Sequence, residues 1–300
     1  MSSHTETIRH DISVLLATRG RTDALKRSVD SLLDLASDQS KIQILFAFDR
    51  DDTKGLDFFQ RQYLDELNQR QVNYAAMAFD RMGYTGLHRY SNTIARHASA
   101  HWLMIWNDDA VMQTQDWDRE IMRWQGQFRL LSVHTHMDHP YSIFPIVPKS
   151  WFDALGYISP HPSQDAWVSQ QAYMLDIYER IPVWVKHDRY DLTGNNQDAT
   201  YEERVIMEGR PHEPGDYHHR DMQALRMQDC HRLAKLLKHQ YQHDVTFWEN
   251  VMNGLQDPWV KLKTNDINQQ MVQFKNPYTH FATQNQSKFE PHGLDQDHST

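Results

Sequence analysis

Strands and helices alternate through the first third of the chain, and this alternation constrains the fold more than any other feature. Apolar segments at 12–17, 42–48, 72–79 and 102–106 predict short buried strands. The stretches between them repeat apolar residues at helical spacing, beginning with a helix for which Thr22 is the expected N-cap. Apolar strands that alternate with helices indicate a mostly parallel central sheet flanked by helices. The expected fold class is therefore α/β.

Polar residues gather where three of these strands end. The clusters are Thr18-Arg19-Gly20-Arg21, Asp49-Arg50-Asp51-Asp52 and Asn107-Asp108-Asp109. In open α/β sheets, ligands bind beyond the carboxyl ends of the strands. One such cluster is compatible with a solvated loop, whereas three at the same edge indicate a common binding site.

Two adjacent carboxylates, Asp108 and Asp109, follow the fourth strand. Like charges at a buried strand end repel each other and lose hydration, and a divalent cation relieves both costs. Oxygen ligands suit Mg²⁺ or Mn²⁺, which bind through one or two carboxylates together with substrate phosphates. A turn with two solvated aspartates is an equally good interpretation of this pair alone.

The other two clusters offer groups that suit a nucleotide. Arg19 and Arg21 suit a diphosphate, because a guanidinium binds phosphate oxygens in pairs and also stacks on rings. Asp49 suits a base or a ribose as a hydrogen-bond acceptor. Each of these residues also has an ordinary interpretation, as part of a solvated loop or as a turn aspartate.

Three further candidates lie in the second half of the chain. Asp165 falls in the first turn of a helix expected near Ser163, where the helix dipole favours the ionised carboxylate that a general base requires. Trp167 is either an apolar platform for a sugar ring on the acceptor side or part of the core. His187 ends a strand expected at 181–188, and a neutral imidazole there can bind a divalent metal.

Composition limits the compartment and the partners. A net charge of −9 without a long basic run disfavours nucleic acid and anionic membranes as partners. The single cysteine, Cys230, excludes an internal disulfide and fits a reducing compartment. The N-terminus lacks an apolar signal core, and no stretch approaches the roughly 20 apolar residues of a membrane span. We expect a cytoplasmic protein without a membrane span; its oligomeric state stays open.

Taken together, the clusters resemble the GT-A fold nucleotide-sugar glycosyltransferases, specifically the large family-two-like group. The segments that carry the resemblance are, in order, ISVLLATRGRTDALKRSVDSL, FAFDRDD, YSNTIARHASAHWLMIWNDDA and FPIVPKSWFDALGYISPHPSQDAW. Their order and spacing, rather than any single motif, make the combination specific. The resemblance covers about residues 10–205 and implies a UDP- or GDP-sugar donor and Mn²⁺ or Mg²⁺ as cofactor.

The resemblance also implies a role for each candidate residue. Those that would contact the nucleotide sugar are Thr18, Arg19, Arg21, Asp49, Asn92 and Asp108. Asp109 and His187 would bind the metal, and Asp165 would be the catalytic base. Two positions depart from the family pattern. Asn107 stands where many members have Asp, which leaves the metal site with less charge, and Gln164 stands where Glu is frequent.

These observations predict a metal-dependent glycosyltransferase that moves a sugar from a nucleotide-diphosphate donor to an acceptor hydroxyl with inversion. The glycosyltransferase domain would occupy residues 1–215, followed by a helical C-terminal extension at 216–281 and a disordered tail at 282–300. Part of the long polar stretch 186–219 would form a lid over the donor.

Three other functions fit parts of the pattern. A non-catalytic carbohydrate- or protein-binding module on the same fold is compatible with Asn107 and Gln164. A nucleotidyltransferase typically has a glycine-rich phosphate loop, whereas the loop after the first strand holds one glycine, Gly20. A metal phosphohydrolase would need more spaced His and Asp residues than the His187-Asp188 pair offers.

Overall fold

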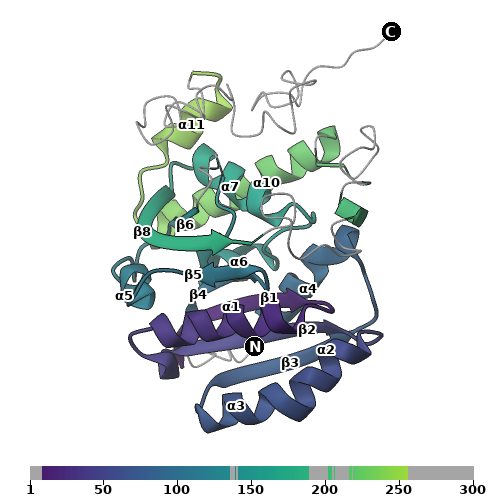
Figure 1. Ribbon diagram of the computed structural model, residues 1–300. Helices are drawn as coiled ribbons and strands as arrows, with labels where there is room; N and C mark the ends of the chain where they lie inside the picture. The colour runs from purple at the N-terminus through teal and green to yellow at the C-terminus, as the bar shows by residue number, and fades with distance from the viewer. Residues whose placement is uncertain are drawn as a thin grey trace, which may run out of the picture.

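The computed structural model describes residues 9–135, 139, 141–188, 202–204, 206, 216–217 and 219–255. Within these residues, eight strands form one sheet in the order β3-β2-β1-β4-β7-β6-β8-β5 (Figure 1). The strands are β1 (His10–Thr18), β2 (Ile42–Asp49), β3 (Asn73–Phe79), β4 (Ala100–Asn107), β5 (Ala110–Met112), β6 (Leu130–Thr135), β7 (Ile146–Pro148) and β8 (Tyr178–His187).

The first four strands of this order form a parallel block. β1 is parallel to β2 and to β4, and β3 extends the block beyond β2. β7 is antiparallel to β4 and β6, β8 is parallel to β6, and β5 is antiparallel to β8. Leu16 of β1 aligns with Phe46 of β2 and with Trp106 of β4, so the carboxyl ends of these strands reach the same edge. The predicted α/β class with a mostly parallel sheet is confirmed.

Helices connect the strands. Their bounds are α1 (Thr22–Leu35), α2 (Thr53–Phe58), α3 (Leu64–Gln69), α4 (Leu87–Ala95), α5 (Trp117–Met122), α6 (Lys149–Leu155), α7 (Gln164–Met174), α10 (Arg220–Gln240) and α11 (Thr246–Met252). A π-helical turn at Phe59–Tyr63 joins α2 to α3, and 3₁₀ turns lie at Gln39–Lys41 and Tyr84–Gly86. The predicted N-cap of α1 is wrong by one residue: Arg21 holds that position, and Thr22 is the first helical residue.

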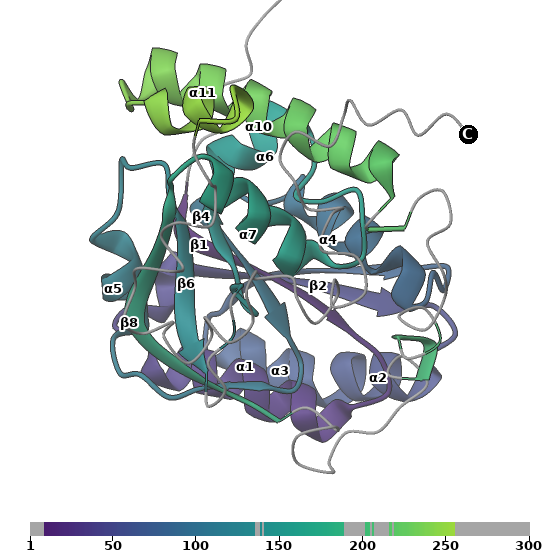
Figure 2. The ribbon, with the colours of Figure 1, turned by 90° about the horizontal axis from the view of Figure 1, so that it is seen from above.

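The helices lie on both faces of the sheet, and each face has its own hydrophobic core (Figure 2). α1, α2, α3 and α5 cover one face, whereas α4, α6, α7 and α10 cover the other. Successive residues of β1 point into alternate cores, with Val14 and Leu16 in the first and Leu15 in the second. This two-sided burial explains why the strand is apolar at nearly every position.

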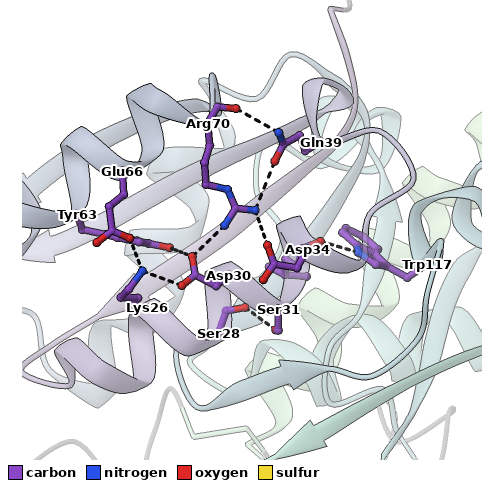
Figure 3. Close-up of polar contacts among 11 residues, drawn as sticks. Lys26, Ser28, Asp30, Ser31, Asp34, Gln39, Tyr63, Glu66, Arg70 and Trp117 are labelled. Carbon is purple, nitrogen blue, oxygen red and sulfur yellow. Dashed lines mark hydrogen bonds and ion pairs between the residues drawn. The ribbon is translucent and has the colours of Figure 1, made fainter.

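Polar contacts hold α1 against the helices that follow β2 (Figure 3). Asp30 accepts hydrogen bonds from Lys26 at 2.9 Å, Tyr63 at 3.0 Å and Arg70 at 3.3 Å. Arg70 also donates to Asp34 at 2.7 Å. These contacts fix the orientation of α1 and therefore of the loop that enters it from β1.

The C-terminal helices pack on the sheet rather than apart from it. α10 places Cys230 and Leu233 in the same core as Trp151 of α6. No helix in the described part of the chain is both long and apolar enough to cross a membrane. The predicted tail at 282–300 and most of the predicted lid lie outside the described residues, and the predicted division of the chain near residue 215 stays a prediction.

Candidate functional site

The loop after β1 meets the turn after β4 at the carboxyl edge of the parallel block. Thr18 Oγ1 donates a hydrogen bond of 2.7 Å to Asp108 Oδ2. The Arg21 guanidinium lies 2.5 Å from Asp108 Oδ1 and 3.3 Å from Asp109 Oδ2. Asp108 is fully buried and Asp109 is 5% exposed, so Arg21 supplies positive charge where two carboxylates have lost their hydration. The fold thus joins these four predicted site residues in one cluster.

A left-handed residue shapes the loop that carries the two arginines. Gly20 has φ +71°, a conformation that residues with a Cβ rarely adopt. Its amide donates a 2.7 Å hydrogen bond to Asp52, and Asp52 also caps α2 by accepting from the Gly55 amide at 3.0 Å. The polar cluster after β2 therefore holds the loop after β1 in shape. This role of Asp52 was missed from the sequence, where it was one turn aspartate among several.

Asp49 lies beside this loop, at the end of β2. Arg19 Nη1 is 2.9 Å from Asp49 Oδ2 and 2.5 Å from Asp51. Tyr90 of α4 donates a hydrogen bond to the other oxygen of Asp49. Burial, together with this neighbouring carboxylate, raises the pKa of Tyr90 to about 12, so the phenol stays a donor at neutral pH. Tyr90 was also missed, because its position in the sequence fits the apolar stripe of its helix.

Strand pairing brings His187 to Asp109. β5 begins directly after Asp109 and is antiparallel to β8, with Ala110 opposite His187. The Asp188 amide extends this ladder by donating to the Asp109 carbonyl at 2.8 Å. His187 Nε2 and Asp109 Oδ1 consequently lie 3.3 Å apart in two buried side chains. Neither atom makes a hydrogen bond of good geometry.

This facing pair has the chemistry of two ligands for a divalent cation. Neighbouring ligands about 2.1 Å from a cation are about 3 Å apart, close to the separation of the pair. Burial by itself raises the pKa of Asp109, but the contact with His187 and the charge of Arg21 outweigh burial and bring this pKa below its usual value. Across the described ranges, no group of three or more His, Cys, Asp or Glu side chains is placed to hold a metal. A cation here would therefore need ligands from a substrate or from water.

Asp165 is the one residue of α7 that is not buried, and the structure describes the whole of this helix. It is the second helical residue, where the helix dipole stabilises the ionised carboxylate. The segment before β7 connects this helix to His187. The Ser142 amide donates to Ser169 Oγ of α7 at 3.0 Å, and the Phe144 ring lies 5.0 Å from the His187 ring. Asp165 is thus a partly exposed carboxylate in the first turn of a helix whose other residues are buried.

Comparison with known proteins gives similarity in structure rather than in sequence. No protein-family model matches the sequence, and no curated protein does either. The S. aureus TarS fragment 1–349, in complex with UDP-GlcNAc, is 10% identical, with a TM-score of 0.58 over 92% of this chain and 74% of that one. A mannosyltransferase from Pyrobaculum calidifontis, in complex with GDP-Man and Mn²⁺, is 11% identical, with a TM-score of 0.53 over 94% and 88%. Both structures have the GT-A fold.

This chain has the GT-A fold. The parallel block β3-β2-β1-β4 and the turn after β4, which holds Asp108 and Asp109, are the parts of it that form the polar cluster. The resemblance of the sequence to GT-A glycosyltransferases is therefore borne out at the level of the fold.

Two residues of the predicted site make contacts outside the polar cluster of this GT-A fold, and the donor contact predicted for Asn92 stays a prediction. Trp167 is 0% exposed and packs in the core, with the Arg226 guanidinium 4.8 Å from its ring centroid. The prediction of an acceptor platform at Trp167 is corrected, since the ring has no free surface. Asn92 accepts from the Ile158 amide at 2.8 Å and donates to the Ser159 carbonyl at 2.7 Å. Its contacts hold the turn between α6 and α7 and do not include the polar cluster.

Proposed function

We propose that the chain is a metal-dependent glycosyltransferase that moves a sugar from a nucleotide-diphosphate donor to an acceptor hydroxyl, with inversion. One observation carries the proposal. Buried Asp109 and His187 face each other at the strand edge where α/β sheets bind ligands, each with an atom that lacks a good hydrogen bond. Solved structures of the same fold hold UDP-GlcNAc, or GDP-Man with Mn²⁺, which supports a donor of this type.

The donor diphosphate would lie against the loop that carries Arg19 and Arg21, because guanidinium groups bind phosphate oxygens in pairs. Asp109 and His187 would hold Mn²⁺ or Mg²⁺, which when bound supplies charge neutralisation for the leaving group. Asp108 is buried beneath Thr18 and Arg21, so its part would be to orient Arg21.

The nucleoside end of the donor would meet Asp49. Arg19 and Tyr90 fix the orientation of this carboxylate, so its remaining lone pairs can accept hydrogen bonds from a base or a ribose. Uracil and guanine both present such donors. The proposal therefore covers UDP and GDP sugars alike.

Asp165 would act as the general base. It would take the proton of the acceptor hydroxyl while the hydroxyl oxygen attacks the anomeric carbon from the face opposite the diphosphate. The bond from this carbon to the diphosphate oxygen breaks with its electron pair leaving on the diphosphate, and the configuration inverts. Because the diphosphate is a stable leaving group, positioning and charge neutralisation would supply most of the rate enhancement.

Calorimetry with UDP and with GDP, each with and without Mn²⁺, tests the donor site. We expect one nucleotide to bind at least tenfold more tightly with Mn²⁺, and the Asp109→Asn variant to lose this difference. Asp80→Asn is the matched control. Asp80 follows β3, is exposed and forms an ion pair with Arg50, so this variant should leave the effect of Mn²⁺ intact. Equal affinity with and without Mn²⁺ in the unmodified chain would refute metal dependence.

A second measurement separates an enzyme from a binding module. The protein is incubated with UDP and GDP sugars and Mn²⁺, and release of the free nucleotide is followed. A glycosyltransferase should release nucleotide slowly into water and faster with an acceptor, whereas a non-catalytic module binds the nucleotide without turnover.

The proposal also includes a cytosolic location and a C-terminal extension that begins near residue 216. Cys230, the single cysteine, is a buried thiol in α10, which is compatible with a reducing compartment. Because α10 shares a core with α6, a chain that ends at residue 215 should unfold at a lower temperature than the full chain. Cell fractionation tests the location.

A further inference from the structure

Trp184 of β8 is the one exposed aromatic residue of the described part of the chain. Its side chain is 52% exposed, whereas five other tryptophans are at most 2% exposed: Trp102, Trp106, Trp117, Trp151 and Trp167. Burial of a large aromatic ring is a strong stabilising contribution, and leaving such a ring in water forgoes it. Trp184 therefore presents a flat apolar ring to solvent, on which a ligand can stack.

The Trp184 ring is held in place before any ligand arrives. His134 of β6 stacks on it with ring centroids 4.6 Å apart and an interplanar angle of 18°. The backbone is fixed on both sides, since Trp184 pairs with His134 on β6, and its carbonyl accepts from the Gln113 amide at 2.9 Å. The Trp184 amide donates to Thr114 Oγ1 at 2.7 Å. A ring fixed in this way loses little conformational entropy on binding.

The stacked pair lies on the face of the sheet that α7 covers. Tyr178, on β8 and on the same face as Trp184, stacks on Tyr173 of α7 with ring centroids 4.4 Å apart. β6 and β8 are parallel, and α7 leads directly into β8, so the helix runs back against the direction of the strands. The N-terminus of α7, which carries Asp165, therefore lies toward the carboxyl end of β8, and Trp184 is in the C-terminal half of that strand.

The neighbours of the ring are polar. Lys186, on the same side of β8, is exposed, as is Gln113 beside the Trp184 carbonyl. A flat apolar ring with hydrogen-bonding groups at its border matches a pyranose, which has an apolar C–H face and a rim of hydroxyls. A protein partner is usually met by a contiguous apolar patch instead.

We propose that Trp184, backed by His134, is the platform on which a sugar ring of the acceptor stacks, so that the acceptor is a saccharide or a glycoside. The identification of the bound sugar as the acceptor rests on the proposed function. The platform itself is proposed as a sugar-binding site on the described surface, whatever reaction the protein catalyses. It replaces Trp167, which the sequence indicated, with a tryptophan whose ring is accessible.

Titration of the full chain with methyl glycosides of glucose, galactose, mannose and N-acetylglucosamine, followed by saturation-transfer NMR without nucleotide, tests the platform. We expect at least one glycoside to bind, Trp184→Ala to weaken that binding at least tenfold, and Trp184→Phe to weaken it less than threefold. With a nucleotide-sugar donor present, Trp184→Ala should raise the KM for that glycoside and leave kcat and the nucleotide Kd unchanged. Leu255→Ala, which removes another exposed apolar side chain, should change none of these.

Three results would overturn the proposal. The first is that no glycoside binds the unmodified chain, and the second is that Trp184→Ala binds glycosides normally. The third is that sedimentation shows a dimer which Trp184→Ala dissociates, because the ring then belongs to an interface between copies. If the unmodified chain binds neither UDP nor GDP, the proposed function fails, while the glycoside titration, which contains no nucleotide, still decides the platform.

Discussion

Arg21 and a divalent cation held by Asp109 would both place positive charge beside Asp108 and Asp109, and the Arg21→Met substitution separates their effects. The Arg21 guanidinium lies 2.5 Å from buried Asp108 and 3.3 Å from buried Asp109. Removing one partner from a buried ion pair costs about 3–5 kcal/mol. Because the Arg21 side chain is itself 23% exposed, we expect the lower end of this range. A loss of about 3 kcal/mol corresponds to a Tm lower by roughly 6–12 °C in a domain of this size.

Mn²⁺ should act in the opposite direction on this variant. Without the guanidinium, Asp108 and Asp109 lose the positive charge that Arg21 supplies, so Arg21→Met should bind Mn²⁺ at least tenfold more tightly than the unmodified chain, and Mn²⁺ should restore much of the lost Tm. The nucleotide should bind more weakly, because a phosphate-binding group is missing. Thermal unfolding with and without Mn²⁺, together with electron paramagnetic resonance of free Mn²⁺, measures these effects.

The matched control for this experiment is Arg50→Met. Arg50 pairs with Asp80, and both side chains are exposed, so this ion pair should contribute little to stability. The Tm and the Mn²⁺ affinity of the control should stay near those of the unmodified chain. If Arg21→Met keeps the Tm and the Mn²⁺ affinity of the unmodified chain, the reasoning about the shared carboxylates is wrong.

Three other substitutions test separate parts of the molecule. Asp165→Asn should lower turnover about 100-fold or more while nucleotide affinity holds, and unchanged turnover would exclude Asp165 as the base. Burial raises the pKa of Asp229 in α10, so the protonated side chain stabilises the folded state. This contribution to the free energy of unfolding is fully present below the ordinary carboxyl pKa and is lost as the pH rises through the raised pKa. The loss is at most about 1.4 kcal/mol per pH unit. Urea unfolding between pH 4 and 8 should show this loss in the unmodified chain and not in Asp229→Asn; equal slopes would contradict the raised pKa. Asn92→Ala should lower the Tm by loosening the turn before α7 and leave nucleotide affinity unchanged. Weaker nucleotide binding by this variant would instead support the donor contact predicted for Asn92 from the sequence.

The strands of the parallel block could be predicted from the local sequence, because a strand that is buried on both faces is a continuous run of apolar residues. The strand expected at 42–48 is Ile42–Asp49, and the strand expected at 102–106 is Ala100–Asn107. The meeting of Thr18 with Asp108 follows from the same pattern, since parallel strands deliver their carboxyl ends to one edge.

Partners within the site were harder to predict. Asp52 and Tyr90 became visible only when the loops were in place, because a hydrogen bond from the Gly20 amide or to Asp49 depends on loop geometry that residue type does not encode. The resemblance implied that His187 and Asp109 lie together, but the contact itself depends on the β5–β8 register, which brings together strands far apart in the sequence.

The sequence by itself determined the α/β class, the strand edge and the residue types gathered there, because each of these leaves a local periodic signal. Only the tertiary structure decided which tryptophan side chain is exposed to solvent. Trp167 sits in a helix in which every residue except Asp165 is buried, and Arg226 of α10 lies on its ring. Trp184 sits on a strand whose same face is covered by α7 at Tyr178, yet its own side chain stays 52% exposed. Burial depends on what packs across a residue from distant parts of the chain, and residue type alone does not carry that information.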